Sequence, residues 1–304
     1  MSQKTRCHIL LLITAIAWGS GFLAQKEGSE VEPFTFNGAR FLLAGLFLIS
    51  AFPLLDRVRG LAKAGVGGPG RRGGFSFTRA ELAAGLICGL MLSAGVNLQQ
   101  MGIYFHTDAG KAGFITALYI IFVPLLGLLA GRKISLTVWG CVFLGLYGFY
   151  LLTMAGKGSL TLEQGDFFIL LCSLAFAVHI KVLEKYAPGL DGVRLAAVQF
   201  IVTGLSSLLL MGLFEQPTWE AVYGCRQAIL FGALVSTDIG YTLQVIGQQH
   251  ADPVVASLLM SLEAVFAAVF GCIFLGEALT MTEGLGCVVI FTAVVIPQVL
   301  DSRR

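Results

Sequence analysis

Apolar runs recur along almost the whole chain, and short polar breaks separate them. A hydrocarbon core about 30 Å thick takes roughly 20 helical residues, so each run is long enough to cross a membrane. Cutting the chain at charges, prolines and glycine clusters predicts ten spans, at residues 8–26, 34–55, 80–104, 109–131, 134–155, 164–186, 192–214, 227–248, 253–275 and 280–300. The pattern therefore predicts an all-α membrane protein with ten transmembrane helices.

Composition excludes several other classes of protein. Hydrophobic residues make up 56% of the 304 residues, charged residues only 12%, and a soluble domain carries about twice that charge. A formal net charge of +2 argues against a nucleic-acid partner. The seven cysteines contain no CxxC pair and most lie in apolar runs, which favours free thiols over a metal site. No cofactor is expected.

Lysines and arginines predict how the spans are oriented, because positive loops stay in the cytoplasm. With the N-terminus inside, fifteen of them fall on the inner side, four on the outer side and Arg40 within the second span. The prediction is a multi-pass protein of the cell (inner) membrane with both termini cytoplasmic. Its longest connection is a Gly/Arg-rich loop at about 56–79, in which residues 64–74 read as a mobile linker. No room remains for a soluble catalytic domain.

The chain also matches itself. At an offset of 144 residues, polar residues coincide as well as apolar ones, including Gln100 with Gln244. Upstream the offset becomes 159, as expected if the Gly/Arg-rich loop lengthens only the first copy. We therefore predict two repeats of five spans, at 1–156 and 157–304. Five is an odd number, so the second repeat must be inverted, and inverted repeats place a binding site near the bilayer midplane. This favours a carrier that works by alternating access.

Two polar stripes occupy corresponding spans of the repeats. In the third span the stripe follows helical spacing, and in the eighth it recurs 144 residues later: Ser93, Asn97, Gln100 and Tyr104, then Thr237, Tyr241, Gln244 and Gln248. One interpretation is interhelical hydrogen bonding alone. The other is a substrate cavity, in which Asn97, Gln100, Tyr241 and Gln244 bind the solute. Uncharged donors and acceptors suit a zwitterion or polar metabolite better than a bare ion.

Three ionisable residues are expected within the spans: Glu263, Asp238 and Arg40. Insertion scales put the cost of such a residue at the centre of a helix at about 2.5 to 3.5 kcal/mol, so it usually has a function. Glu263 and Asp238 are candidates for setting the charge of the site or carrying a coupling proton. The alternative is an ion pair with Arg40 or a neutral acid. Tyr119 is the counterpart of Glu263 at the offset of 144 and is expected to lie opposite it. Both are also predicted to bind the substrate.

Short motifs along nearly the whole chain resemble those of the EamA-type drug/metabolite transporters, of the DMT superfamily. They are Trp18-Gly19-Ser20, Pro33 to Asn37 leading to Arg40-Phe41, Gln99-Gln100-x-Gly102, Ala109 to Thr116, Gly165-Asp166, Gln199-Phe200, Glu263 to Ala267 and Leu275-Gly276-Glu277. The resemblance implies ten helices, two inverted repeats, cytoplasmic termini and export of amino acids or other small metabolites. Ala264 stands where the family usually has proline, which leaves the kink of the ninth span and the presentation of Glu263 open.

The leading hypothesis is a secondary transporter that exports small polar metabolites, amino-acid-like or drug-like. Its expected partners are a small-molecule substrate and the lipid bilayer, and a homo-oligomer is left open. A passive facilitator or channel is the first alternative. An intramembrane enzyme is the second, although the chain has no HExxH or GxSxG motif, and no P-loop for ATP.

Overall fold

The computed structural model describes residues 2–63, 74–105, 107, 109–154, 163–276 and 278–301, and within these ranges the chain is almost entirely helical. In chain order the elements are α1 (Gln3–Glu27), η1 (Gly28–Glu30), α2 (Pro33–Ser50), α3 (Phe52–Lys63), α4 (Arg79–Tyr104), α5 (Ala109–Ala117), α6 (Tyr119–Leu129), α7 (Leu136–Thr153), α8 (Gln164–Tyr186), α9 (Gly192–Phe214), α10 (Trp219–Gly224), α11 (Arg226–Phe231), η2 (Gly232–Tyr241), α12 (Thr242–Gln248), α13 (Pro253–Met260), α14 (Glu263–Leu275) and α15 (Met281–Asp301).

The prediction of ten spans in an all-α membrane protein is confirmed. Across the described ranges, nine helical stretches are long and apolar enough to cross a membrane, and Met281–Pro297 within α15 forms a shorter apolar helix. The second span is shorter than predicted, because the chain turns at Ala51 and continues as the separate helix α3. Residues 64–73 of the predicted linker, and the predicted repeat boundary at 156–157, lie outside the described residues.

Three of the predicted spans are not single α-helices. The fourth divides into α5 and α6, and the ninth divides into α13 and α14. The eighth contains η2, a ten-residue π-helix between α11 and α12. Interruptions of this kind leave backbone N–H and C=O groups without their usual helical partners. In a membrane helix such groups are tolerated where they line a cavity or bind neighbouring side chains. The breaks therefore mark the region where a site should be sought.

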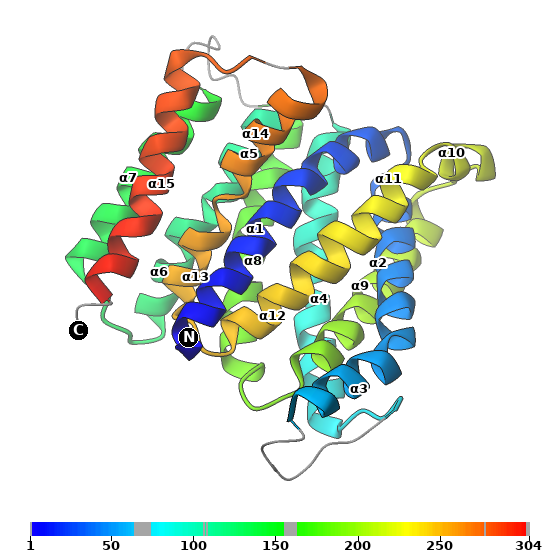
Figure 1. The fold of residues 1–304 in the computed structure, drawn as a ribbon. Helices are drawn as coiled ribbons and strands as arrows, with labels where there is room; N and C mark the ends of the chain where they lie inside the picture. Colours follow the sequence, from blue (N-terminus) through cyan, green and yellow to red (C-terminus); the bar gives the residue numbers. More distant parts are fainter. Residues whose placement is uncertain are drawn as a thin grey trace.

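The most extensive contacts between helices join one half of the chain to the other (Figure 1). The second spans of the halves pack against each other as α2 and α9, and the fifth spans do so as α7 and α15. The first span of each half packs against the third span of the other: α8 contacts α4, and α1 contacts η2 and α12. The architecture is thus two inverted five-helix repeats that share one interior.

Matched glycines permit the close approach of α2 and α9. A Cβ atom on Gly45 would stand 2.7 Å from Cδ1 of Ile201, and one on Gly204 would stand 2.8 Å from the backbone nitrogen of Leu42. Gly45 and Gly204 are related by the offset of 159. Small residues are the usual means by which membrane helices bring their backbones together. Each repeat therefore contributes a glycine to this interface at the equivalent position.

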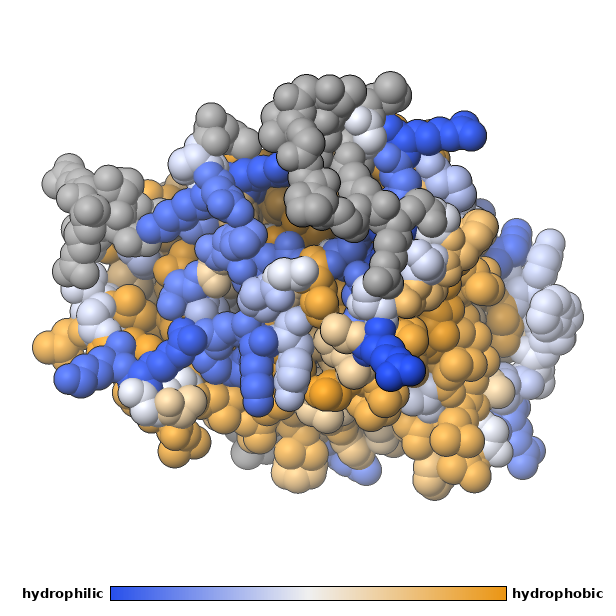
Figure 2. All heavy atoms as spheres, turned by 90° about the horizontal axis from the view of Figure 1, so that it is seen from below, coloured by the Kyte–Doolittle hydropathy of each residue, from blue (hydrophilic) through white to orange (hydrophobic). Residues whose placement is uncertain are grey.

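The two ends of the bundle differ from its sides. Helix α1 begins, and α15 ends, at the end of the bundle that also carries α3 (Figure 1); we call this the terminal end. Hydrophilic side chains gather on this face and hydrophobic ones lie along its rim (Figure 2). Ion pairs here join Arg194 to Asp56, at 2.9 Å, and Arg132 to Glu184. Large apolar side chains such as Leu209, 66% exposed, lie on the outside of the bundle, where lipid would cover them.

Candidate functional site

Two broken helices meet inside the bundle. At Leu118 the backbone N–H donates to Ile115 O at 3.1 Å, and at Leu262 it donates to Leu259 O at 3.2 Å, so both spans tighten into a 3₁₀-like turn before the next helix begins. Tyr119 and Glu263 are the first residues of the helices that follow, α6 and α14. The ninth span breaks here although Ala264 takes the place of a proline.

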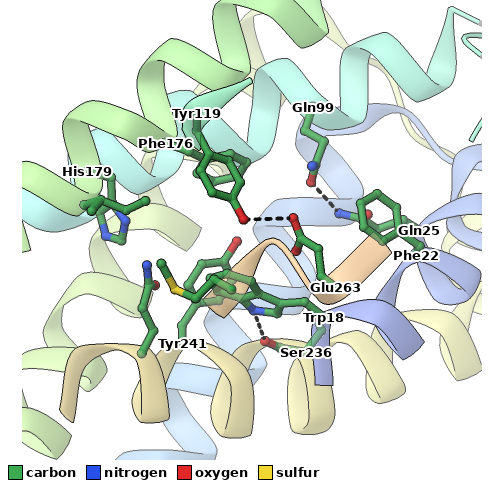
Figure 3. Close-up of a pocket in the computed structure, with 13 residues that line it drawn as sticks. Trp18, Phe22, Gln25, Gln99, Tyr119, Phe176, His179, Ser236, Tyr241 and Glu263 are labelled. Carbon is green, nitrogen blue, oxygen red and sulfur yellow. Dashed lines mark hydrogen bonds between the residues drawn. The ribbon is translucent and has the colours of Figure 1, made fainter. Parts of the chain in front are cut away.

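The first residues of α6 and α14 contact each other across the repeat. Tyr119 donates its hydroxyl hydrogen to Oε1 of Glu263 at 3.5 Å, and the two residues are 144 positions apart (Figure 3). Both side chains are buried, Tyr119 at 2% exposure and Glu263 at 8%. A carboxyl group at membrane depth with one long hydrogen bond is an arrangement that usually serves a function.

A cavity surrounds this contact (Figure 3). Five aromatic side chains form much of its wall: Trp18, Phe22, Tyr119, Phe176 and Tyr241. Six further side chains bring polar atoms: Gln25, Gln99, His179, Ser236, Gln244 and Glu263. The cavity has a volume of about 30 Å³, and one buried water needs roughly 10–15 Å³. A metabolite therefore fits only if side chains or helices move apart.

Helix α1 fastens the π-helix that forms one side of the cavity. Trp18 donates its indole N–H to Ser236 O at 3.2 Å, and Thr14 donates its hydroxyl to Gly240 O at 3.1 Å. The indole also packs against the ring of Tyr241, with centroids 4.8 Å apart. Two backbone carbonyls of η2 thus bind side chains of another helix. Trp18, which the sequence analysis named only as part of a family motif, lines the cavity and binds its backbone.

Amide side chains form a chain of hydrogen bonds at one side of the cavity. Gln25 Nε2 donates to Gln99 Oε1 at 3.0 Å, and Gln99 Nε2 donates to Thr116 Oγ1 at 3.3 Å. Elsewhere His179 Nε2 lies 3.3 Å from Oε1 of Gln199. With Oε1 of Gln199 facing His179, Nε2 of a neutral imidazole is the donor and Nδ1 is the acceptor. Oε1 of Gln244 is buried without a hydrogen-bond partner among the described residues.

The structure brings together four of the six side chains predicted to bind substrate. Tyr119, Tyr241, Gln244 and Glu263 all line the cavity. Asn97 and Gln100 lie outside its lining.

Asn97 and Gln100 are instead bound to neighbouring helices. Asn97 is hydrogen-bonded to Asn37 of α2, to Ser93 of its own helix and to Ser207 of α9. Gln100 donates to the backbone oxygen of Gln25 at 3.2 Å.

The other two predicted ionisable residues, Arg40 and Asp238, are buried but do not line the cavity. Arg40 is 1% exposed, and its guanidinium lies 5.3 Å from the ring centroid of Phe36 and 4.8 Å from that of Phe41. Asp238 is 9% exposed, and neither carboxylate oxygen has a hydrogen-bond partner within the described chain. Within that same part of the molecule, no ion pair joins Arg40 to Asp238 or to Glu263.

Sequence reasoning missed the contribution of α1. Trp18, Phe22 and Gln25 follow i, i+4 and i+7 and so share one helical face. This is the spacing rule that singled out the stripe of the third span, and it applies equally to the first. Gln99 belongs to one of the family motifs, but the repeat favours its neighbour Gln100 as a binding residue, because Gln100 has a matching glutamine in the other repeat.

The comparisons with known proteins agree with this architecture. The sequence model of the EamA-like transporter family matches residues 5–154 and again residues 163–296, which together are most of the chain. This protein is an EamA-like transporter. The family resemblance of the sequence motifs is thereby confirmed, and the chain is a multi-pass membrane protein.

Relatives of this EamA-like transporter span its whole length. An "Uncharacterized transporter" of Archaeoglobus fulgidus is 29% identical over 290 residues, which cover 94% of this chain and 83% of that protein. "Uncharacterized transporter YoaV" of Bacillus subtilis is 24% identical over 97% of each chain. "Uncharacterized inner membrane transporter YicL" of Salmonella typhimurium is 24% identical over 100% of this chain and 98% of its own.

A solved crystal structure also aligns with this EamA-like transporter. The TM-score is 0.75, the sequence identity is 16%, and the alignment covers 98% of each chain. At that identity the likeness concerns the fold alone. The family model and the names of the relatives point to a membrane transporter.

Proposed function

We propose that this EamA-like transporter is a secondary carrier that exports a small polar organic solute by alternating access. One observation carries the proposal: the cavity lies where the broken helices of the two halves meet, with Tyr119 from one half and Glu263 from the other. Carriers built from inverted repeats bind their substrate between the halves, beside discontinuous helices. A gradient of the solute or of protons would supply the energy.

An ion pair joins helices at each end of the bundle, an arrangement that supports a carrier over a pore. At the end opposite the terminal end, Lys111 pairs with Asp166, which also accepts from Thr107 at 3.3 Å. At the terminal end Arg194 pairs with Asp56. Rocking one half against the other would open one set of contacts while the other stays closed. The small volume of the cavity fits a form of the carrier that is closed at both ends.

The residues have distinct roles in this proposal. Tyr119, Tyr241, Gln244 and Glu263 contact the solute. Glu263 and Asp238 are the candidates for a coupling proton, because both are membrane carboxyls without a basic partner. Arg40 sets the charge near the start of η2, where its Cδ lies 2.7 Å from the position of a Cβ on Gly232.

Counterflow in liposomes tests the proposal. Vesicles containing the purified protein are loaded with an unlabelled solute and mixed with a trace of the labelled form, using amino acids, nucleosides and amines in turn. A carrier gives saturable uptake that the internal solute accelerates, whereas a channel or passive pore gives linear uptake that it does not. Protein-free vesicles are the control. Recovery of the solute in altered chemical form would favour the enzyme alternative, and no flux of any solute would overturn the proposal.

Orientation is part of the same proposal. Both termini would lie in the cytoplasm, because the terminal end of the bundle carries exposed Arg57, Arg79, Arg132 and Lys133 and positive loops stay inside. Tags at the N- and C-termini should both resist a membrane-impermeant protease in intact cells and be cut after lysis. Protection of one tag and loss of the other would contradict the inverted repeat itself.

A further inference from the structure

The charge of the cavity is one-sided. Glu263 is the carboxylate among its lining residues, and no lysine or arginine of the described chain lines it. Arg40, the basic residue buried within the second span, is stacked between Phe36 and Phe41 and lies outside the lining. An anionic ligand would thus contact a carboxylate and no lysine or arginine of the lining, whereas a cationic ligand would contact a counter-charge in a medium of low dielectric constant.

Aromatic rings surround the carboxylate of Glu263. The rings of Trp18, Phe22, Tyr119 and Tyr241 line the same cavity, and the hydroxyl of Tyr119 points toward the carboxylate (Figure 3). The faces of Trp, Tyr and Phe rings attract cations, and the attraction grows when the cation is desolvated. Rings together with a single carboxylate form a site suited to an ammonium group attached to an apolar body.

Buried hydrogen-bond acceptors without a partner also lie at the cavity. Gln25 donates one amide hydrogen to Gln99, and Gln99 donates one to Thr116. Oε1 of Gln244 and Nδ1 of His179 are buried acceptors without a partner among the described residues. An amine brings N–H donors to such acceptors, while a carboxylate brings only further acceptors.

We propose that the solute of this cavity is a small organic monocation, a protonated amine with an aromatic or aliphatic body, held by the carboxylate of Glu263 and the rings of Trp18, Tyr119 and Tyr241. The inference rests on the proposed function and narrows the solute from polar metabolites in general to this class. The zwitterion favoured by the uncharged stripes would leave its own carboxylate without a basic side chain in the cavity.

Four ligands with a phenyl ring on a short chain, each in a different charge state, test directly whether the solute is a cation. Phenethylamine is the cation, phenylalanine the zwitterion, phenylacetate the anion and phenethyl alcohol the neutral form. Binding to the purified full-length protein in lipid nanodiscs is read from the rise in unfolding temperature with ligand concentration, since a ligand stabilises the folded state by mass action. Phenethylamine should bind most tightly and phenylacetate should not bind measurably.

Two variants test whether the carboxylate of Glu263 binds the amine. Glu263→Gln should weaken phenethylamine binding by about 30-fold or more, because it leaves a buried cation without its partner. Glu220→Gln makes the same chemical change on exposed α10 and should leave binding unaltered. If Glu263→Gln does not fold, Glu263→Asp, which retains the charge, should still prefer the amine, and the wild-type ligand series decides by itself.

The outcomes separate this inference from the proposed function. Equal or tighter binding of phenylalanine or phenylacetate, or unchanged amine binding by Glu263→Gln, overturns the cation class. If such a protein still shows saturable counterflow of another solute, the carrier proposal stands without the cation. If amines bind through Glu263 but no solute crosses liposomes, the binding site stands and the carrier proposal falls.

Discussion

The polar stripe of α4 and its counterpart in the eighth span occupy equivalent positions in the two repeats but have different surroundings. On α4, Ser93 and Asn97 are hydrogen-bonded to residues of α2 and α9. In the eighth span, 144 residues later, Thr237 has a buried hydroxyl without a partner in the described chain, and Tyr241 faces the cavity. One stripe holds helices together, and the other is available to a ligand.

The difference arises from backbone and neighbours. Helix α4 is continuous and packs against α2 and α9, which bring polar side chains to its stripe. The eighth span contains η2, whose π geometry alters the direction of the side chains, and it packs against α1, which brings Trp18 and Thr14 to its carbonyls instead. The duplicated fold thus keeps its symmetry of packing although the two stripes differ in their hydrogen-bond partners. Exchanging or removing equivalent residues tests this comparison.

The largest effect is expected at the pair Glu263 and Tyr119. Glu263→Gln should reduce transport by at least about 100-fold, because a buried charge that contacts the solute is lost. Tyr119→Phe removes one hydrogen bond of 3.5 Å, which is long for an O–H donor, and should reduce transport by less than about tenfold. Initial rates of counterflow, normalised to reconstituted protein, measure both. Equal losses would show that the two halves contribute alike.

At Asn97 and Tyr241 the comparison concerns stability. Asn97→Ala removes hydrogen bonds to Asn37, Ser93 and Ser207. Two of these partners, Asn37 and Ser207, lie on other helices. At about 0.6 kcal/mol for each interhelical bond, the free energy of unfolding should fall by about 1 kcal/mol. Tyr241→Phe removes a hydroxyl that makes no hydrogen bond within the described residues and should change it by less than about 0.5 kcal/mol.

Unfolding in mixed micelles measures the free energy for both of these variants. A larger loss in Tyr241→Phe than in Asn97→Ala would contradict the assignment of a structural role to α4 and a binding role to the eighth span.

Much of the fold could be predicted because its signals are local or periodic. Apolar runs give the spans, and the offset of 144 gives the repeat. The break at Ala51 was missed, because the run 34–55 is apolar throughout and only the change of direction ends α2. The π-helix η2 was missed as well, since the residues Gly232–Tyr241 carry no proline or glycine cluster that would distinguish them from an ordinary span.

The candidate site was harder to predict, because a site depends on which helices meet. Spacing places Asn97 on a polar face, but no spacing rule says that Ser207 and Asn37, distant in the chain, will satisfy it. The pairing of Tyr119 with Glu263 was accessible only through the repeat. The sequence gives no sign that the indole N–H of Trp18 donates to a backbone carbonyl of η2, because the two residues are distant in the chain.

Gln244 and Gln100 differ in access to the cavity. Gln244 lines it, and its Oε1 has no partner among the described residues, whereas Gln100 donates to Gln25 O and lies outside the lining. Gln244→Ala should raise KM for transport by about three- to tenfold, the worth of one hydrogen bond. Gln100→Ala should leave KM within about twofold of wild type, since it removes no solute contact. Concentration series of counterflow give KM, and a rise in Gln100→Ala alone would reverse the assignment.

The smallest effect is expected at Ser93 and Thr237, where substitution should change the free energy of unfolding in opposite directions. Ser93 accepts hydrogen bonds from Asn97 at 3.0 Å and from Ser206 at 2.8 Å, so Ser93→Ala should lower the free energy of unfolding by about 1 kcal/mol. Thr237 is fully buried and its hydroxyl has no partner in the described chain. Thr237→Val keeps the shape of the side chain and removes an unsatisfied group, so it should leave stability unchanged or raise it by up to about 1 kcal/mol. If Thr237→Val instead destabilises the protein as much as Ser93→Ala does, the hydroxyl of Thr237 is hydrogen-bonded after all, and the second stripe holds helices together like the first.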